Sequence, residues 1–158
     1  MRLDIQHSFS VGATLNQAWS FLWNIEAVAK CIPGCEEVLV REQGTSYQAR
    51  VRRHVGPFLI RFELDIAVAQ SSPPHRIEVV VSGDDKRLRS QIRQSIIVSL
   101  TEVEAGQCQI DLATSFELSG MLASLGERLL GAQIQQELDI FASCIQNSLE
   151  REAASVSG

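Results

Sequence analysis

Hydrophobic and polar residues alternate along most of this chain with the period of two that is typical of β-strands. The segment 58–70 alternates most clearly, because Arg61, Glu63 and Asp65 stand between apolar neighbours. Strands of this kind have one dry and one wet face, as in an antiparallel sheet covered on one side only. Turn residues separate the alternating segments, which predict seven strands at 3–11, 36–42, 46–56, 58–70, 76–83, 88–103 and 107–118.

Two short helices are expected between the first and second strands. Thr14 and Gln17 have the spacing of a capping box, a hydroxyl at the cap and an amide three residues later. Apolar residues at helical spacing follow as far as Trp23. Asn24 can then cap a second short helix that ends near Cys31.

A long helix is expected after the last strand, from Gly120 to about Leu149, because apolar residues there recur three or four positions apart. The element order predicts an α+β fold in which a curved, seven-stranded antiparallel sheet wraps around this C-terminal helix. We expect a single domain over residues 1–150, followed by a short, small and polar tail at 151–158 that is disordered.

Several short motifs resemble the CoxG family of carbon monoxide dehydrogenase subunits. The most specific is Cys-Ile-Pro-Gly-Cys at residues 31–35, and it follows an aromatic segment at 18–22 that fits the same pattern. Residues 55–57, 72–74 and 125–130 support the resemblance, which extends over about residues 3–149. The family belongs to the START-like, helix-grip superfamily, which agrees with the architecture expected from the alternation.

The resemblance implies an accessory protein rather than a catalytic one, associated with a molybdenum-containing dehydrogenase of the carbon monoxide or xanthine type. Its relatives hold apolar molecules between sheet and helix. We therefore expect a small quinone- or lipid-like ligand, no cofactor and dehydrogenase subunits as partners. The alternatives are a cyclase- or dehydratase-type enzyme that uses the same cavity, and a protein-docking module with a vestigial cavity. Some longer members dock on membranes through a hydrophobic C-terminal extension; without one, we expect no permanent anchor and at most transient membrane contact.

The expected ligand cavity is lined by apolar residues of the dry faces and by a few polar ones. Arg53 is in phase with Tyr47 and Val51, so it should point inward, where it needs a carboxylate or a ligand oxygen; a one-residue register slip would turn it to solvent. The full set is Leu22, Tyr47, Val51, Arg53, Phe58, Phe62, Val79, Ile92, Gln94, Phe116, Leu122, Leu125, Gly126 and Leu129.

Two glycines, Gly126 and Gly131, lie inside the expected long helix, where each costs about 1 kcal/mol relative to alanine. They make room either for a ligand or for close packing of helix on sheet. Cys31 and Cys35 are best interpreted as small buried thiols beside a tight turn, because no partner set completes a metal site. No catalytic constellation is visible, and His7 fits a hydrogen-bonded histidine of the core or its rim.

Net charge limits the classes of partner. The formal charge is −5 and the pI is near 5.2, which argues against nucleic-acid binding and against simple electrostatic attachment to anionic lipid. The amino terminus lacks a signal-peptide pattern, so we expect a cytoplasmic location with mostly reduced cysteines. Arginines on the wet faces could dock an acidic partner or simply pair with carboxylates across strands; the docking candidates are Arg50, Arg61, Arg89 and Arg93.

Overall fold

The computed structural model describes residues 1–157 and contains one antiparallel sheet of seven strands, as the alternation predicts. The strands lie in the order β1-β7-β6-β5-β4-β3-β2, so every neighbouring pair except β1–β7 is joined directly along the chain. The strand bounds are β1 (Arg2–Val11), β2 (Cys35–Glu42), β3 (Ser46–Val55), β4 (Phe58–Ser72), β5 (Arg76–Asp85), β6 (Ser90–Glu104) and β7 (Gln107–Ser119).

Both short helices begin at the caps that the sequence predicts. Helix α1 (Leu15–Trp23) starts at Thr14, whose hydroxyl accepts from the amide of Gln17 while the Gln17 side chain accepts from the Thr14 amide. Helix α2 (Ile25–Ala29) starts at Asn24, whose side chain accepts from the Ala27 amide. These bonds satisfy amide donors that a helix N-terminus leaves unpaired.

The long helix differs from the expectation at both ends. A short 3-10 helix, η1 (Leu122–Leu125), precedes α3 (Glu127–Ser157), and Gly126 separates them with a φ of 87°. This backbone conformation strongly favours glycine and ends a helix. At the other end α3 continues to Ser157, whereas the sequence suggests a disordered tail from residue 151; Gly158 lies outside the described residues.

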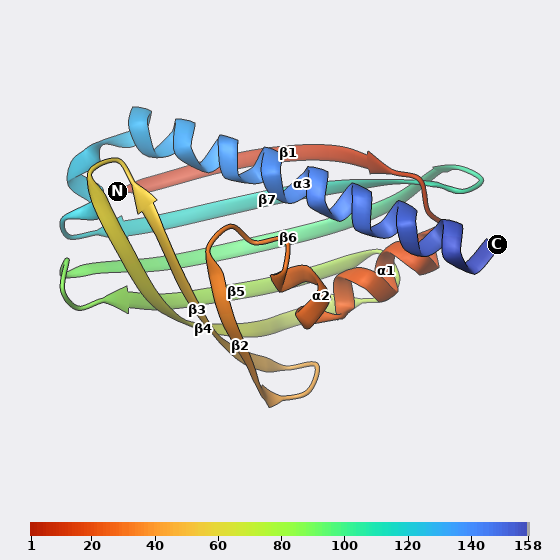
Figure 1. Ribbon diagram of the computed structural model, residues 1–158, viewed down its shortest axis with the longest axis horizontal. Coiled ribbons are helices and arrows are strands. Elements are labelled where there is room, and N and C mark those ends of the chain that lie inside the picture. The colour runs from red at the N-terminus through yellow and green to blue at the C-terminus, as the bar shows by residue number, and fades with distance from the viewer. Residues whose placement is uncertain (158) are drawn as a thin grey trace.

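Helix α3 lies across one face of the curved sheet, alongside β1 (Figure 1). We call this face, which α3 partly covers, the inner face. Helices α1 and α2 lie near the C-terminal end of α3, and η1 lies at the opposite end of the molecule, close to the N-terminus (Figure 1). In the part of the chain that the structure describes, no helix is long and apolar enough to cross a membrane.

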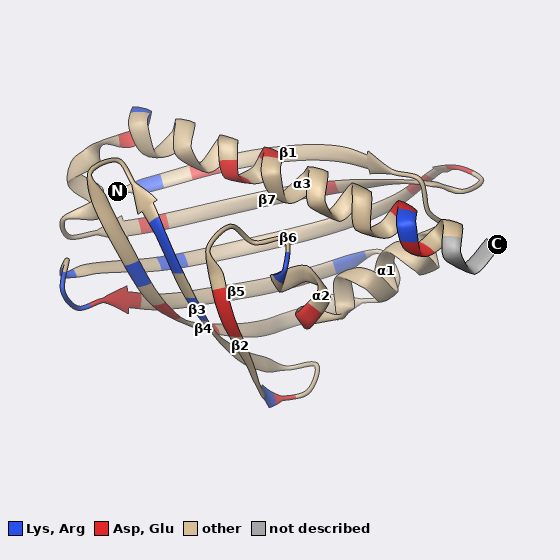
Figure 2. Ribbon diagram, viewed as in Figure 1, with Lys and Arg blue, Asp and Glu red and all other residues tan. Residues whose placement is uncertain are grey.

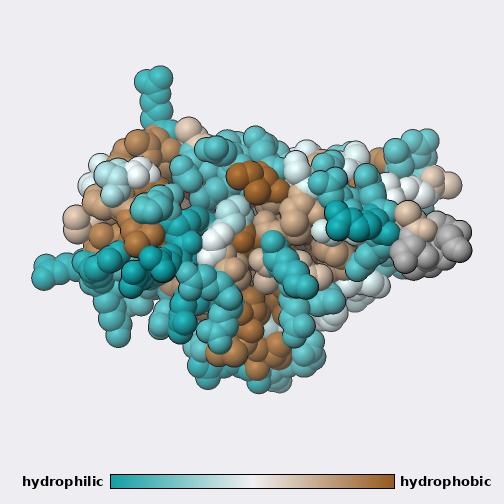
Figure 3. All heavy atoms as spheres, viewed as in Figure 1, coloured by the Kyte–Doolittle hydropathy of each residue, from teal (hydrophilic) through white to brown (hydrophobic). Residues whose placement is uncertain are grey.

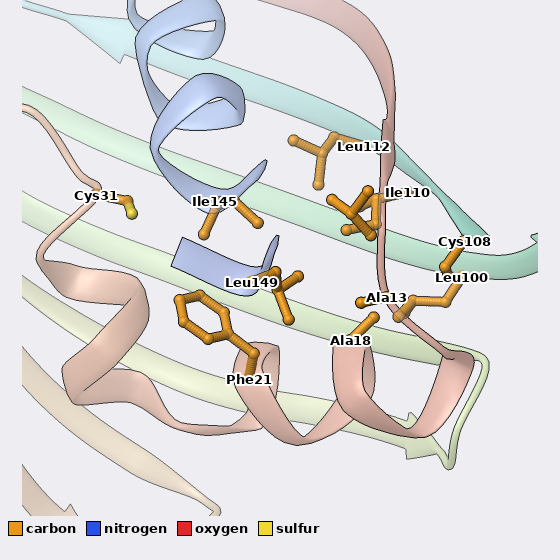
Figure 4. Packing of buried hydrophobic residues seen from close by; sticks show 11 residues of the cluster. Ala13, Ala18, Phe21, Cys31, Leu100, Cys108, Ile110, Leu112, Ile145 and Leu149 are labelled. Carbon is orange, nitrogen blue, oxygen red and sulfur yellow. The ribbon is translucent and has the colours of Figure 1, made fainter. Parts of the chain in front are cut away.

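Two separate clusters of buried apolar residues hold the layers together. The first, which we call the α1-end core, joins α1, α3 and the strands β6 and β7 (Figure 4). Its buried members are Val11, Ala13, Ala18, Phe21, Cys31, Leu100, Cys108, Ile110, Leu112, Ile145 and Leu149. The second, the η1-end core, contains Val55, Ile60, Phe62, Leu88, Phe116, Leu118, Leu122 and Leu130.

A disulfide joins Cys31 to Cys144, so the expectation that the cysteines are reduced is wrong for this pair. The two residues are 113 positions apart, but α3 passes over the end of the α2 segment and brings their Cα atoms to 5.3 Å. That distance is within the range that a disulfide spans. Cys35 and Cys108 are free thiols, and burial raises the pKa of both.

Candidate ligand-binding site on the inner face

The middle of the inner face, between the two cores, is apolar and only partly covered. Ile66, Val79 and Ile96 point to this side, belong to neither core and remain partly exposed. Side chains that are opposite each other in an antiparallel pair lie on the same face. The strand register accordingly places Tyr47, Ile66, Val81, Gln94 and Phe116 in one row across five strands.

Arg53 reaches over this surface from β3 and confirms the inward register that the alternation predicts. It is opposite the buried Ile60, and its Nε lies 2.9 Å from Oε1 of Glu137 on α3. Its Nη1 donates to the carbonyl of Pro33 at 2.8 Å. The Arg53–Glu137 bridge therefore ties together β3, the segment before β2, and α3.

The bridge leaves hydrogen-bonding capacity unused. The Nε–H of Arg53 is buried but not aligned for a hydrogen bond to Glu137, although the two charges are in ion-pair contact. Among the described residues, Nη2 has no hydrogen-bond partner. A guanidinium offers five donors, so Arg53 can still donate to an oxygen atom of a bound molecule.

Glu137 is the most perturbed acid at this site. Burial raises the pKa of its carboxyl, and the opposing effects of Arg53 and of the Gln133 amide, which donates to it at 3.1 Å, do not fully compensate. Ionisation of Glu137 is thus harder in the folded protein than in water. Glu137 was not among the predicted residues, since it lies in a polar run of the helix that resembles a solvent-exposed face.

A second polar point lies on the floor of the same surface. The Gln94 side-chain amide donates to the hydroxyl of Thr114 at 3.0 Å, and Thr114 is only 6% exposed. Thr114 interrupts an otherwise apolar phase of β7, which is a signal that the sequence contains and that our prediction missed. Two polar points on an apolar surface are what a mainly apolar molecule with oxygen-bearing groups requires.

The two glycines have different roles. A Cβ atom placed on Gly131 meets nothing within 4 Å, so close packing of helix on sheet does not explain this glycine. The open space beside Gly131 agrees with the other interpretation, room next to a bound molecule. Gly126 lies outside α3, in the link where its positive φ is needed.

The remaining residues of the predicted cavity are spread over several environments. Tyr47 and Val51 are buried in the middle of the inner face, and Val79 is partly exposed there. Leu22 packs against the α1-end core, while Leu129 lies at the surface. The η1-end core contains Phe62, Phe116 and Leu122, with Phe58, Ile92 and Leu125 packed against it.

The three residues considered for catalysis have separate partners. Tyr47 accepts from the Gly44 amide at 2.9 Å through its hydroxyl, and His7 Nε2 lies 3.8 Å from Oδ1 of Asp139. Arg53 instead contacts Glu137. Within the described residues, no contact joins any two of the three, and no group of three or more His, Cys, Asp or Glu side chains could hold a metal ion.

The outward face of the sheet carries two hollows, with volumes of about 680 and 510 Å³. Their linings mix both signs of charge: Arg50, Arg61 and Arg93 alternate with acids, and Arg50 is 3.5 Å from Glu37. Cross-strand pairing therefore accounts for part of the arginine set predicted to dock a partner. Arg89 is not on this face but in the turn before β6, with a φ of 49°.

The fold defines the class of protein: it is START-like, a curved sheet gripping a C-terminal helix. A START superfamily protein from Mycobacterium smegmatis has a TM-score of 0.72 at 10% identity, covering 94% of this chain and 97% of that one. The Zhui aromatase/cyclase from Streptomyces sp. R1128 has a TM-score of 0.70 at 14% identity, with coverages of 96% and 95%.

Within this class, the chain belongs to the CoxG family of carbon monoxide dehydrogenase subunits, which matches residues 8–150. A conserved protein from Geobacillus kaustophilus has a TM-score of 0.86 at 22% identity, covering 94% of this chain and 96% of that one. No curated protein matches the sequence. The family resemblance seen in the motifs is thereby confirmed.

Proposed function

We propose that this protein binds a small, mainly apolar molecule of quinone- or lipid-like character on the middle of its inner face, beneath α3. The observation that carries the proposal is the partial exposure of Ile66, Val79 and Ile96 between two well-packed cores. Apolar side chains that face a protein interior yet remain accessible are stabilised when a ligand removes them from water.

The polar groups around this surface suggest where a ligand is oriented. Arg53 has unused donors, and the Gln94–Thr114 pair lies on the sheet below. A carbonyl, hydroxyl or carboxylate of the ligand would accept from Arg53, while its hydrocarbon part covers the apolar strands. This arrangement favours a molecule with a few oxygen atoms at one end over a pure hydrocarbon.

Family membership supports the cellular context of this binding. In this proposal the protein acts as an accessory to a molybdenum-containing dehydrogenase, to which it supplies or from which it receives the bound molecule. A cyclase- or dehydratase-type activity remains the alternative, because the fold also occurs in an aromatase/cyclase. No contact among Tyr47, His7 and Arg53 favours that alternative.

Native mass spectrometry of the protein from its own host tests the proposal, with a co-purifying apolar molecule as the expected result. Val79→Trp fills the site from β5 and should abolish this adduct. Val80→Trp is the matched control, because Val80 is the next residue, faces outward and is 47% exposed. Absence of any bound molecule in the wild type, together with no binding of added quinones or lipids, would overturn the proposal.

A further inference from the structure

Three turns meet at the end of the molecule that carries η1. The turn between β5 and β6 contacts the start of β4, because Arg87 Nη2 donates to the Leu59 carbonyl at 2.6 Å. It also contacts η1, whose Leu122 amide donates to Ser90 Oγ at 2.9 Å. The turn between β3 and β4 joins them, since a Cβ on Gly56 would lie 3.6 Å from Leu125. We call this surface, formed by residues 56–59, 86–89 and 120–129, the basic end.

The basic end carries exposed cations without neutralising partners. Lys86, Arg87, Arg89 and Arg128 are all exposed, and within the described residues none of them forms an ion pair (Figure 2). The exposed acid among these residues is Glu127. Local charge is therefore positive although the whole chain has a formal charge of −5.

Nearby carboxylates do not cancel this charge. Asp85 is 4% exposed and is used internally, where it accepts from the backbone amides of Arg61 and Leu88. Glu117 is opposite Arg2 and Arg93 in the strand register and so lies beside cations of its own. The positive charge of the basic end is thus available to an external partner.

The same end exposes apolar side chains. Met121 is 46% exposed and Leu129 is 42% exposed, and the partly exposed Phe58 and Leu125 also belong to this end. Figure 3 shows apolar atoms with hydrophilic side chains around them on the side where η1 lies. An apolar patch surrounded by lysine and arginine is the composition that binds the interface of an anionic bilayer.

We propose that the basic end docks the protein, reversibly, on a membrane that contains anionic phospholipid. Met121 and Leu129 enter the headgroup region, and Lys86, Arg87, Arg89 and Arg128 contact lipid phosphates. The charge distribution also sets the orientation, because the β6–β7 turn at the other end of the sheet carries the exposed acids Glu102 and Glu104 and is repelled by the same surface (Figure 2).

Flotation with phospholipid vesicles tests the electrostatic part. We expect binding to phosphatidylcholine vesicles that contain phosphatidylglycerol, little binding to phosphatidylcholine alone, and release by salt. The triple variant Lys86→Gln/Arg87→Gln/Arg89→Gln should weaken binding by about 100-fold, since each cation near an anionic surface contributes roughly fivefold. The matched control removes one exposed lysine and two exposed arginines elsewhere: Lys30→Gln/Arg41→Gln/Arg151→Gln.

A second pair of variants tests the apolar part. Leu129→Ser should weaken vesicle binding by about tenfold, the value of partly burying one leucine. Ile140→Ser is its control on the same helix, because Ile140 is 51% exposed but lies away from the basic end. Equal binding to both kinds of vesicle, equal loss in the triple variant and its control, or binding of acidic proteins but not of vesicles would overturn the proposal. The proposed ligand site is tested separately, because the docking variants leave the inner face unchanged.

Discussion

Replacing Cys144 by serine opens the covalent link between the α2 segment and α3, and the structure sets the size of the effect. The disulfide closes a loop of 113 residues. In the chain-entropy description, a link of this length removes enough freedom from the unfolded chain to stabilise the fold by about 5 kcal/mol. A domain of this size has a total stability of about 5–15 kcal/mol, so the variant should lose a large fraction of it.

Urea unfolding followed by circular dichroism measures this loss. The midpoint of Cys144→Ser should fall well below that of the oxidised wild type, and reductant should shift the wild type by a similar amount but leave the variant unchanged. Cys35→Ser is the control, because Cys35 is a free thiol outside the bridge. If reductant does not shift the wild type and the variant unfolds at the same urea concentration, the bridge does not constrain the unfolded chain as argued.

The disulfide also bears on the ligand site. Cys31 precedes Pro33 by two residues, and the Pro33 carbonyl accepts from Arg53. Opening the bridge therefore loosens one of the segments that hold Arg53 over the inner face. In native mass spectrometry, Cys144→Ser should retain less of the co-purifying ligand than Cys35→Ser.

Three further substitutions test individual contacts by urea unfolding. Burial raises the pKa of Glu137, so its stabilising contribution is complete below the unfolded-state pKa and is lost as the pH rises through the folded-state pKa; Glu137→Gln should therefore gain stability relative to the wild type between acidic and neutral pH, and a constant difference would contradict this. Gly131→Ala should add up to about 1 kcal/mol, because the new methyl group meets open space; a loss would show that the site is filled. Asp85→Ala should cost about 3 kcal/mol, since it leaves two backbone amides without their acceptor, and a loss below about 1 kcal/mol would refute that role.

The fold was predictable because each local signal has one dominant physical cause. Alternation of period two fixes which side of a strand is dry, and Thr14 and Asn24 mark helix starts through hydrogen bonds that involve only neighbouring residues. The break at Gly126 was missed, because apolar spacing continues through it and reveals nothing about φ. Backbone conformation at a single glycine decides the break, and a periodicity argument averages over it.

The candidate site was only half predictable. Arg53 stands out because a charge in an apolar phase must find a partner. Its partner Glu137 is 84 positions away on a helix whose rotation about its axis the apolar pattern fixes only roughly. Cys144 was missed for the same reason, since its contact with Cys31 depends on where α3 crosses the α2 segment. Long-range pairs of this kind require the tertiary arrangement.

The basic end shows why net charge alone misleads about membranes. A formal charge of −5 argues against electrostatic attachment only if the charge is spread evenly over the surface. Screening limits the reach of a surface charge to about 10 Å, which is much shorter than the sheet. A membrane in contact with the η1 end therefore interacts with Lys86, Arg87, Arg89 and Arg128, and hardly with the acids of the β6–β7 turn. These cations come from segments far apart in the sequence, and only the meeting of the β5–β6 turn with η1 and the start of α3 makes them one surface.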